Sequence, residues 1–152
     1  MITGCGYTHQ PLFPQGIQTV AVPIFKSDVF YQGIERHVTE ALIKQIELQT
    51  IYKISPLNQA DSVIRGTVTH ADQGRLSRRR EGGLPTELEL KLTVQFQWLD
   101  LQTGEVLRSR NGLTSVGRYI PATEVGEQYQ VAQYQAAQKI ASSIIAAMGA
   151  NW

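Results

Sequence analysis

The sequence reads LELKLTVQFQW from Leu88 to Trp98. Every second residue of this segment is apolar, and the residues between them, from Glu89 to Gln97, are charged or polar. Because successive side chains of a β-strand point to opposite faces of a sheet, this alternation predicts a long antiparallel strand with one buried face and one wet face. The core of the protein is therefore expected on one side of a sheet.

Two further strands are predicted beside this one. Ser62 to Arg75 has Val63, Arg65, Thr67 and Thr69 on one face and Ile64, Gly66, Val68 and His70 on the other, with Gly66 as a possible bulge. The turn Gln102-Thr103-Gly104 leads into residues 105–117 and predicts a hairpin. The apolar positions of its second strand are expected to be Val106, Leu113 and Val116, and Asn111-Gly112 fits either a bulge or a second turn.

The N-terminal half predicts a strand, a helix and another strand. Thr19 to Phe25 has the composition of a strand, and Pro23 suggests that it ends at an edge or in a bulge. After Lys26-Ser27-Asp28, with Asp28 as a plausible cap, apolar residues recur at helical spacing until Thr50. Tyr52 to Ser55 then reads as a short strand, which implies a parallel pair with a right-handed crossover. The predicted apolar face of the helix consists of Phe30, Ile34, Val38, Ala41, Leu42 and Ile46.

A second helix is predicted from Gly126 to Met148, and Gly149 is expected to end it. Its apolar stripe is rich in alanine, which permits close approach to a sheet: Tyr129, Ala136, Ala137, Ile140, Ile144, Ala147 and Met148. The predicted fold class is α+β, with two helices packed on one face of a mixed, mainly antiparallel sheet of four to five strands.

Length and composition indicate one domain. The chain has 152 residues, close to a common domain size, and we assign 1–16 to a tether and 17–152 to a single α/β domain. The 14 basic and 13 acidic residues leave no basic excess, so the charge gives no reason to expect nucleic acid as a partner. No apolar stretch approaches the roughly 20 residues of a membrane-spanning helix.

The single cysteine, Cys5, excludes an internal disulfide and a multi-cysteine zinc site. Its context, Gly4-Cys5-Gly6-Tyr7, is that of a bacterial lipoprotein cysteine that receives a lipid, and the alternative is an incidental cysteine. A signal peptide requires an apolar run of roughly 7 to 15 residues before its cleavage site. Only Met1 to Gly4 precede Cys5, so we expect that the sequence was trimmed or that its start was assigned too late.

The chain resembles the lipopolysaccharide-assembly lipoproteins of the LptE type. The resemblance covers most of the sequence and rests on the order and spacing of its segments: Gly4-Cys5-Gly6-Tyr7, Ile17 to Phe25, Thr39-Glu40-Ala41-Leu42, Ala60-Asp61 leading to Gly66-Thr67, Gly83-Leu84-Pro85, and the alternating strand to Asp100-Leu101. It implies a lipid-anchored protein of the outer membrane that faces the periplasm, sits inside or against the lipopolysaccharide-transport β-barrel, and binds lipopolysaccharide. Cys5 would then carry the lipid, and Gly6 lacks the aspartate expected to retain a lipoprotein in the inner membrane.

Four arginines gather beside Gly82-Gly83: Arg75, Arg78, Arg79 and Arg80. One interpretation is that their guanidinium groups bind phosphates of lipid A, because guanidinium binds phosphate bidentately. A second is a solvated hairpin tip whose like charges block pairing between sheet edges. A third is contact with acidic residues in the lumen of a barrel, and the sequence leaves all three open.

The sequence predicts neither catalysis nor a cofactor or metal. His9, His37 and His70 lie far apart, and His37 with Glu40 lacks the second histidine of a zinc-protease motif. Two alternatives to the transport role remain. One is another periplasmic lipoprotein module, an activator of a cell-wall synthase or a secretion-pore component. The other is a small soluble enzyme, which would need a pocket with convergent polar groups.

Overall fold

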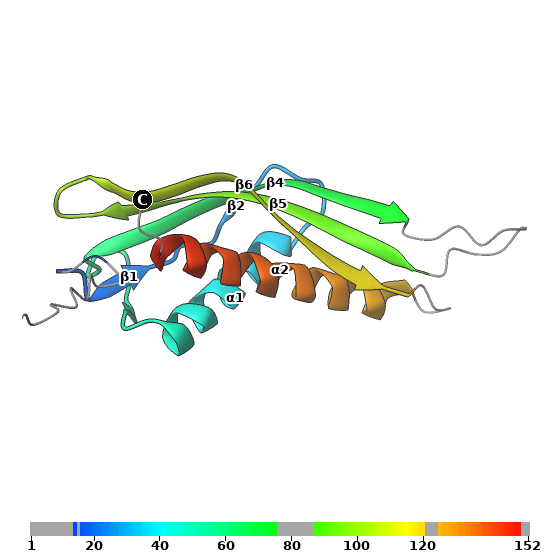
Figure 1. The fold of residues 1–152 in the computed structure, drawn as a ribbon, viewed down its shortest axis with the longest axis horizontal. Helices are drawn as coiled ribbons and strands as arrows, with labels where there is room; N and C mark the ends of the chain where they lie inside the picture. Colours follow the sequence, from blue (N-terminus) through cyan, green and yellow to red (C-terminus); the bar gives the residue numbers. More distant parts are fainter. Residues whose placement is uncertain (1–13, 15, 76–86, 121–124, 150–152) are drawn as a thin grey trace, which may run out of the picture.

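The computed structural model describes residues 14, 16–75, 87–120 and 125–149, with the side chains of Arg75 and 125–128 left out. Its sheet has six strands, and its two helices cover one face of that sheet (Figure 1). The α+β fold class is therefore confirmed. Cys5, Arg78, Arg79 and Arg80 lie outside the described residues, as does most of the predicted tether.

Three long antiparallel strands make the body of the sheet. They are β4 (Ser62–Arg75), β5 (Leu88–Asp100) and β6 (Val106–Tyr119), and β5 pairs with β4 on one side and β6 on the other. The sheet order is β3-β1-β4-β5-β6, and β2 also pairs with β4. Short parallel strands complete the β4 side: β1 (Thr19–Ala21), β2 (Lys26–Ser27) and β3 (Lys53–Ile54).

The alternation of β5 is confirmed. The side chains of Leu90, Leu92, Val94, Phe96 and Trp98 are buried beneath the helices, while those of Lys91, Gln95 and Gln97 are exposed on the helix-free face. The indole Nε1 of Trp98 donates a hydrogen bond to Ser62 Oγ at 3.0 Å, so the largest core side chain leaves no polar atom without a partner. Ser62 Oγ in turn donates to the Thr19 carbonyl at 3.1 Å, which links β1 to the same core.

Helix α1 (Ile34–Gln49) begins later than predicted. Gly33 precedes it with a φ of 94°, and no side chain caps it, so the prediction of Asp28 as a cap is wrong. Asp28 instead donates its backbone N–H to the Val68 carbonyl at 2.9 Å and extends the β2 pairing. Phe30 is fully exposed, because it precedes the helix and does not share its apolar face. The other predicted residues of that face are buried.

The parallel β1 and β3 pair is confirmed, with Thr19 opposite Lys53. Asp61 fixes the start of β1, because its carboxylate accepts hydrogen bonds from the backbone N–H groups of Gln18 and Thr19 at 2.9 and 3.0 Å and from the Thr19 hydroxyl at 3.0 Å. These bonds favour the charged carboxylate and lower the pKa of Asp61. The predicted strand to Phe25 stops at Ala21, since Pro23 interrupts it and a separate strand begins at Lys26.

Bulges in β4 and β6 reset the faces of the sheet. The β4 bulge lies at Thr69 and not at Gly66, so His70 turns to the helix-free face, opposite to the predicted face. The β6 bulge at Asn111-Gly112 is confirmed, and Gly112 has a φ of 75°. Beyond it the core-facing residues are Ser115, Gly117 and Tyr119. The predicted apolar positions Val106 and Val116 are therefore wrong, since Val106 is exposed and Val116 is only half-buried.

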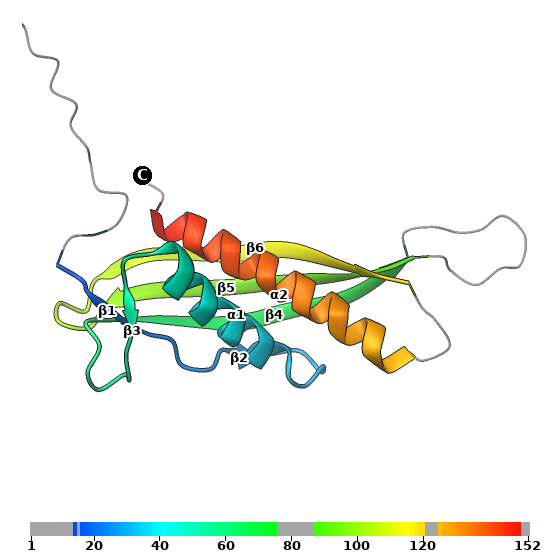
Figure 2. The same cartoon turned by 90° about the horizontal axis from the view of Figure 1, so that it is seen from below.

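Glycines allow two close approaches in this core. A Cβ at Gly66 would overlap the ring of Phe25, which fills the space beneath β4. A Cβ at Gly117 would overlap the backbone carbonyl of Ala132 in helix α2 (Val125–Gly149). The expected alanine-rich contact is confirmed, because Ala132, Ala136, Ala137 and Ala141 are fully buried where α2 crosses the sheet beside α1 (Figure 2).

Gly117→Ala is expected to lower the free energy of unfolding by about 1 to 3 kcal/mol, because the added methyl group meets backbone that cannot move aside alone. Gly74→Ala in β4 is the matched control. The added Cβ at residue 74 contacts only the flexible Glu89 side chain. We therefore expect the free energy of unfolding to fall by less than about 1 kcal/mol. Urea unfolding followed by circular dichroism measures both, and equal losses in the two variants would contradict this account of the helix contact.

Candidate functional site

The predicted arginine cluster begins at one end of the sheet. Arg75 is the last residue of β4, and the register places it opposite Leu88, which lies opposite Tyr119 in β6. We call this the distal end of the sheet, on the right in Figure 1. Residues 76–86, which include Arg78, Arg79 and Arg80, join β4 to Glu87 in the sequence and lie outside the described residues.

A pocket of about 390 Å³ opens at the distal end. Its lining contains one acidic residue, one basic residue and three apolar or aromatic residues: Glu87, Arg118, Tyr119, Ile120 and Val131. Ile120 and Val131 are more than half exposed, at 63% and 52%. Sequence analysis did not single out these residues, because β6 and α2 come together there only in the folded chain.

Three tyrosines hold this end together. The ring of Tyr129 on α2 lies 5.8 Å from that of Tyr31 and 5.9 Å from that of Tyr119, between centroids. Burial raises the pKa of both Tyr119 and Tyr129. The amides of Gln73 and Gln133 lie near enough to the Tyr129 hydroxyl to oppose that rise, but neither forms a hydrogen bond of good geometry with this buried oxygen. The cluster therefore serves packing.

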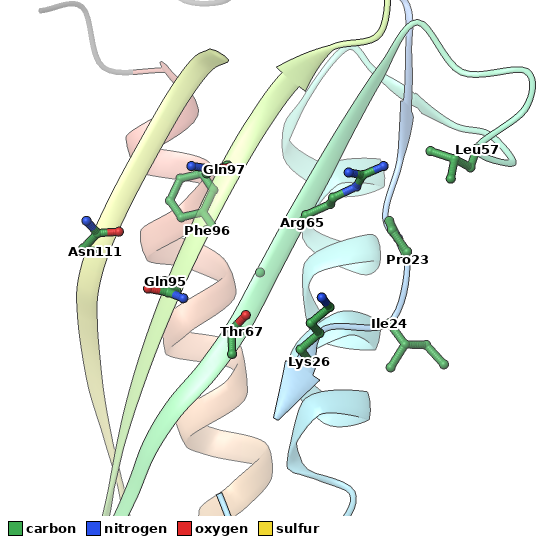
Figure 3. A pocket seen from close by; sticks show the side chains of 11 residues that line it. Pro23, Ile24, Lys26, Leu57, Arg65, Thr67, Gln95, Phe96, Gln97 and Asn111 are labelled. Atoms are coloured by element: carbon green, nitrogen blue, oxygen red, sulfur yellow. The ribbon is translucent and has the colours of Figure 1, made fainter. Parts of the chain in front are cut away.

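A second hollow lies on the helix-free face, nearer the other end. Figure 3 shows this groove of about 450 Å³, with the helices behind the sheet. Lys26 and Arg65 lie between the carboxamides of β5 and β6 on one side and the apolar side chains of the β1–β2 and β3–β4 connections on the other. The residues that line this groove include Lys26, Arg65, Gln95, Gln97, Ile24 and Leu57.

Among the described residues, no group of three or more His, Cys, Asp or Glu side chains could hold a metal ion. Neither α1 nor the described part of α2 combines the length and hydropathy needed to cross a bilayer. What both hollows offer is charge beside exposed apolar side chains, an arrangement suited to binding.

The family model for lipopolysaccharide assembly, LptE, matches residues 17–148 of this chain. This chain belongs to the LptE family. The match covers all eight described helices and strands except the last residue of α2, and it confirms the family resemblance noted from the sequence. No curated protein matches the chain in a direct search.

Solved structures share the LptE-family fold of this chain at low sequence identity. A protein from Xanthomonas campestris has a TM-score of 0.62 and 11% identity, over 90% of this chain and 86% of that one. A Caulobacter crescentus protein described as a lipoprotein has a TM-score of 0.58 and 18% identity, over 82% and 87%. PelC of Paraburkholderia phytofirmans, a dodecamer, has a TM-score of 0.53 and 14% identity, over 93% and 94%. These likenesses establish the fold alone.

Tyr129→Ala is expected to lower the free energy of unfolding by about 2 to 4 kcal/mol, because it removes the ring that joins α2 to Tyr31 and Tyr119. Tyr129→Phe keeps the ring and deletes only a buried hydroxyl that lacks a good partner, so a change below about 1 kcal/mol is expected. Thermal or urea unfolding compares the two. A large loss in the Phe variant would show that the hydroxyl, and not the ring, stabilises this end.

Proposed function

We propose that this protein is a non-catalytic, lipid-anchored component of the outer membrane that partners and plugs the lipopolysaccharide-transport β-barrel. The observation that carries the proposal is the match of residues 17–148 to the lipopolysaccharide-assembly family LptE, which supports a role in that process. The two hollows, each lined by charged and apolar side chains, are compatible with a binding role.

The anchor in this proposal is a lipid on Cys5, with the domain facing the periplasm. A single acyl chain binds a membrane only marginally, at roughly 0.8 kcal/mol per buried CH₂, whereas the several chains of a bacterial lipoprotein anchor it stably. Membrane attachment would then need no basic surface. The four arginines from Arg75 to Arg80 are left for another ligand.

That ligand, in this proposal, is the phosphate-bearing lipid A part of lipopolysaccharide, bound by Arg75, Arg78, Arg79 and Arg80. The distal pocket supports the idea, because the exposed side chains of Ile120 and Val131 add apolar surface there. Phosphates and acyl chains need cationic and apolar contacts side by side.

The test of the overall role is capture of the tagged, full-length protein from detergent-solubilised native membranes. We expect a large β-barrel protein to co-purify in near-stoichiometric amount. The Cys5→Ser variant should leave the membrane fraction, because the anchor is lost. Recovery of a cell-wall synthase or a secretion-pore subunit would instead favour the alternative lipoprotein roles, and an unchanged membrane fraction for Cys5→Ser would refute the anchor.

Replacing Arg78, Arg79 and Arg80 together with Ala is expected to weaken lipopolysaccharide binding at least roughly tenfold, about 1.4 kcal/mol, without unfolding the domain. The reason is the loss of charge-assisted hydrogen bonds to phosphate. Equilibrium binding to purified lipopolysaccharide at moderate salt measures the effect. A control with the exposed cations Arg36, Lys44 and Lys53 replaced by Ala removes equal charge elsewhere, and equal weakening in both variants would argue against a specific site.

A further inference from the structure

We propose that the groove on the helix-free face docks an acidic segment of the partner protein, with Lys26 and Arg65 as its ionic contacts. This inference rests on the proposed function, since the partner is the transport barrel. It adds the surface of this chain that meets the partner and the chemistry of the segment that fits there.

The charges of the helix-free face divide into two regions. In the distal region, the strand register places opposite charges directly across from each other: Asp72 faces Lys91, and Glu89 faces Arg118. Such cross-strand pairs of opposite charge stabilise a sheet and offset each other's field. The distal region of this face therefore carries acidic and basic residues in balanced numbers at facing positions.

The groove region lacks this compensation. Arg65 lies opposite Gln97, which lies opposite Ser109, and Lys26 lies opposite Thr67, which lies opposite Gln95. None of the residues that line the groove is acidic, and both cations are exposed. Among the described residues, no acidic group forms an ion pair with either side chain. Two neighbouring positive charges are thus left for a ligand of negative charge.

The rest of the lining favours a protein segment over a lipid. The carboxamides of Gln95, Gln97 and Asn111 each offer hydrogen-bond donors and an acceptor, which match the N–H and C=O groups of a polypeptide. One wall is apolar, where Ile24 and Leu57 are 64% and 47% exposed. That wall can contact an aliphatic or aromatic side chain of the segment.

The volume and the position suit this use. A hollow of about 450 Å³ lies within the range of pockets that take a few side chains of a ligand. The face carries no helix, so a barrel wall can approach the sheet directly (Figure 1). Complementary charge at such a contact sets the register and speeds association.

The test is a charge reversal in the full-length protein, Lys26→Glu with Arg65→Glu, followed by capture from native membranes. We expect at least tenfold less co-purified barrel than with the unchanged protein. Arg36→Glu with Lys44→Glu on α1 is the matched control, because it changes the net charge equally on the helix side and should capture the barrel normally. Thermal unfolding of the purified variants checks the fold. Should the reversal unfold the domain, Lys26→Gln with Arg65→Gln replaces it. This neutral variant is also expected to capture less barrel, but with a smaller loss than the reversal.

The outcomes separate the two proposals. Failure of the unchanged protein to capture a barrel would overturn the proposed function, and this inference with it. Normal capture by the unchanged protein and by the groove variant would overturn the inference alone. Normal capture with weakened binding to purified lipopolysaccharide would also overturn it, and would assign the groove to an anionic lipid. Loss of the barrel with unchanged lipopolysaccharide binding supports it.

Discussion

Burial of one face of β5 is the constraint on which the structure depends. Its core side chains, from Leu90 to Trp98, lie between two long partner strands and beneath α2, so they meet the helices only while the register holds on both sides. A slip of one residue would exchange the buried and exposed faces. The hydrogen bond from Trp98 to Ser62 opposes such a slip, because it satisfies the indole N–H only in this register.

The same constraint produces the binding face. Since both helices pack on one side, the other side of a three-strand antiparallel body remains open, and its side chains are set by the alternation of β5. The bulges then decide which residues of β4 and β6 appear there. The bulge at Thr69 brings His70 and Asp72 to the open face, where Asp72 meets Lys91, whereas Arg65 lies before the bulge and meets only Gln97.

Solved proteins with this fold differ widely in sequence. PelC and the Caulobacter crescentus protein share the arrangement of helices and sheet at 14% and 18% identity. A sheet whose alternating apolar residues pack against two helices can be built from many sequences. It requires only the right pattern of apolar residues and the right total volume of core side chains. Family membership, shown over residues 17–148, is the finding that links this chain to lipopolysaccharide assembly.

The sequence by itself determined the elements and their layers. The period of two in Leu88–Trp98 and the helical spacing in Ile34–Ile46 arise from local geometry, so they predicted β5, α1 and the single covered face correctly. Only the tertiary structure decided the bulge at Thr69 and the burial of Ser115 and Gly117. It also decided the exposure of Phe30 and the position of Lys26 and Arg65 in the lining of one groove. These features depend on contacts between distant segments, such as Gly66 with Phe25 and Gly117 with Ala132, which no local pattern encodes. Cys5 and the arginines from 78 to 80 remain predictions of the sequence, since they lie outside the described residues.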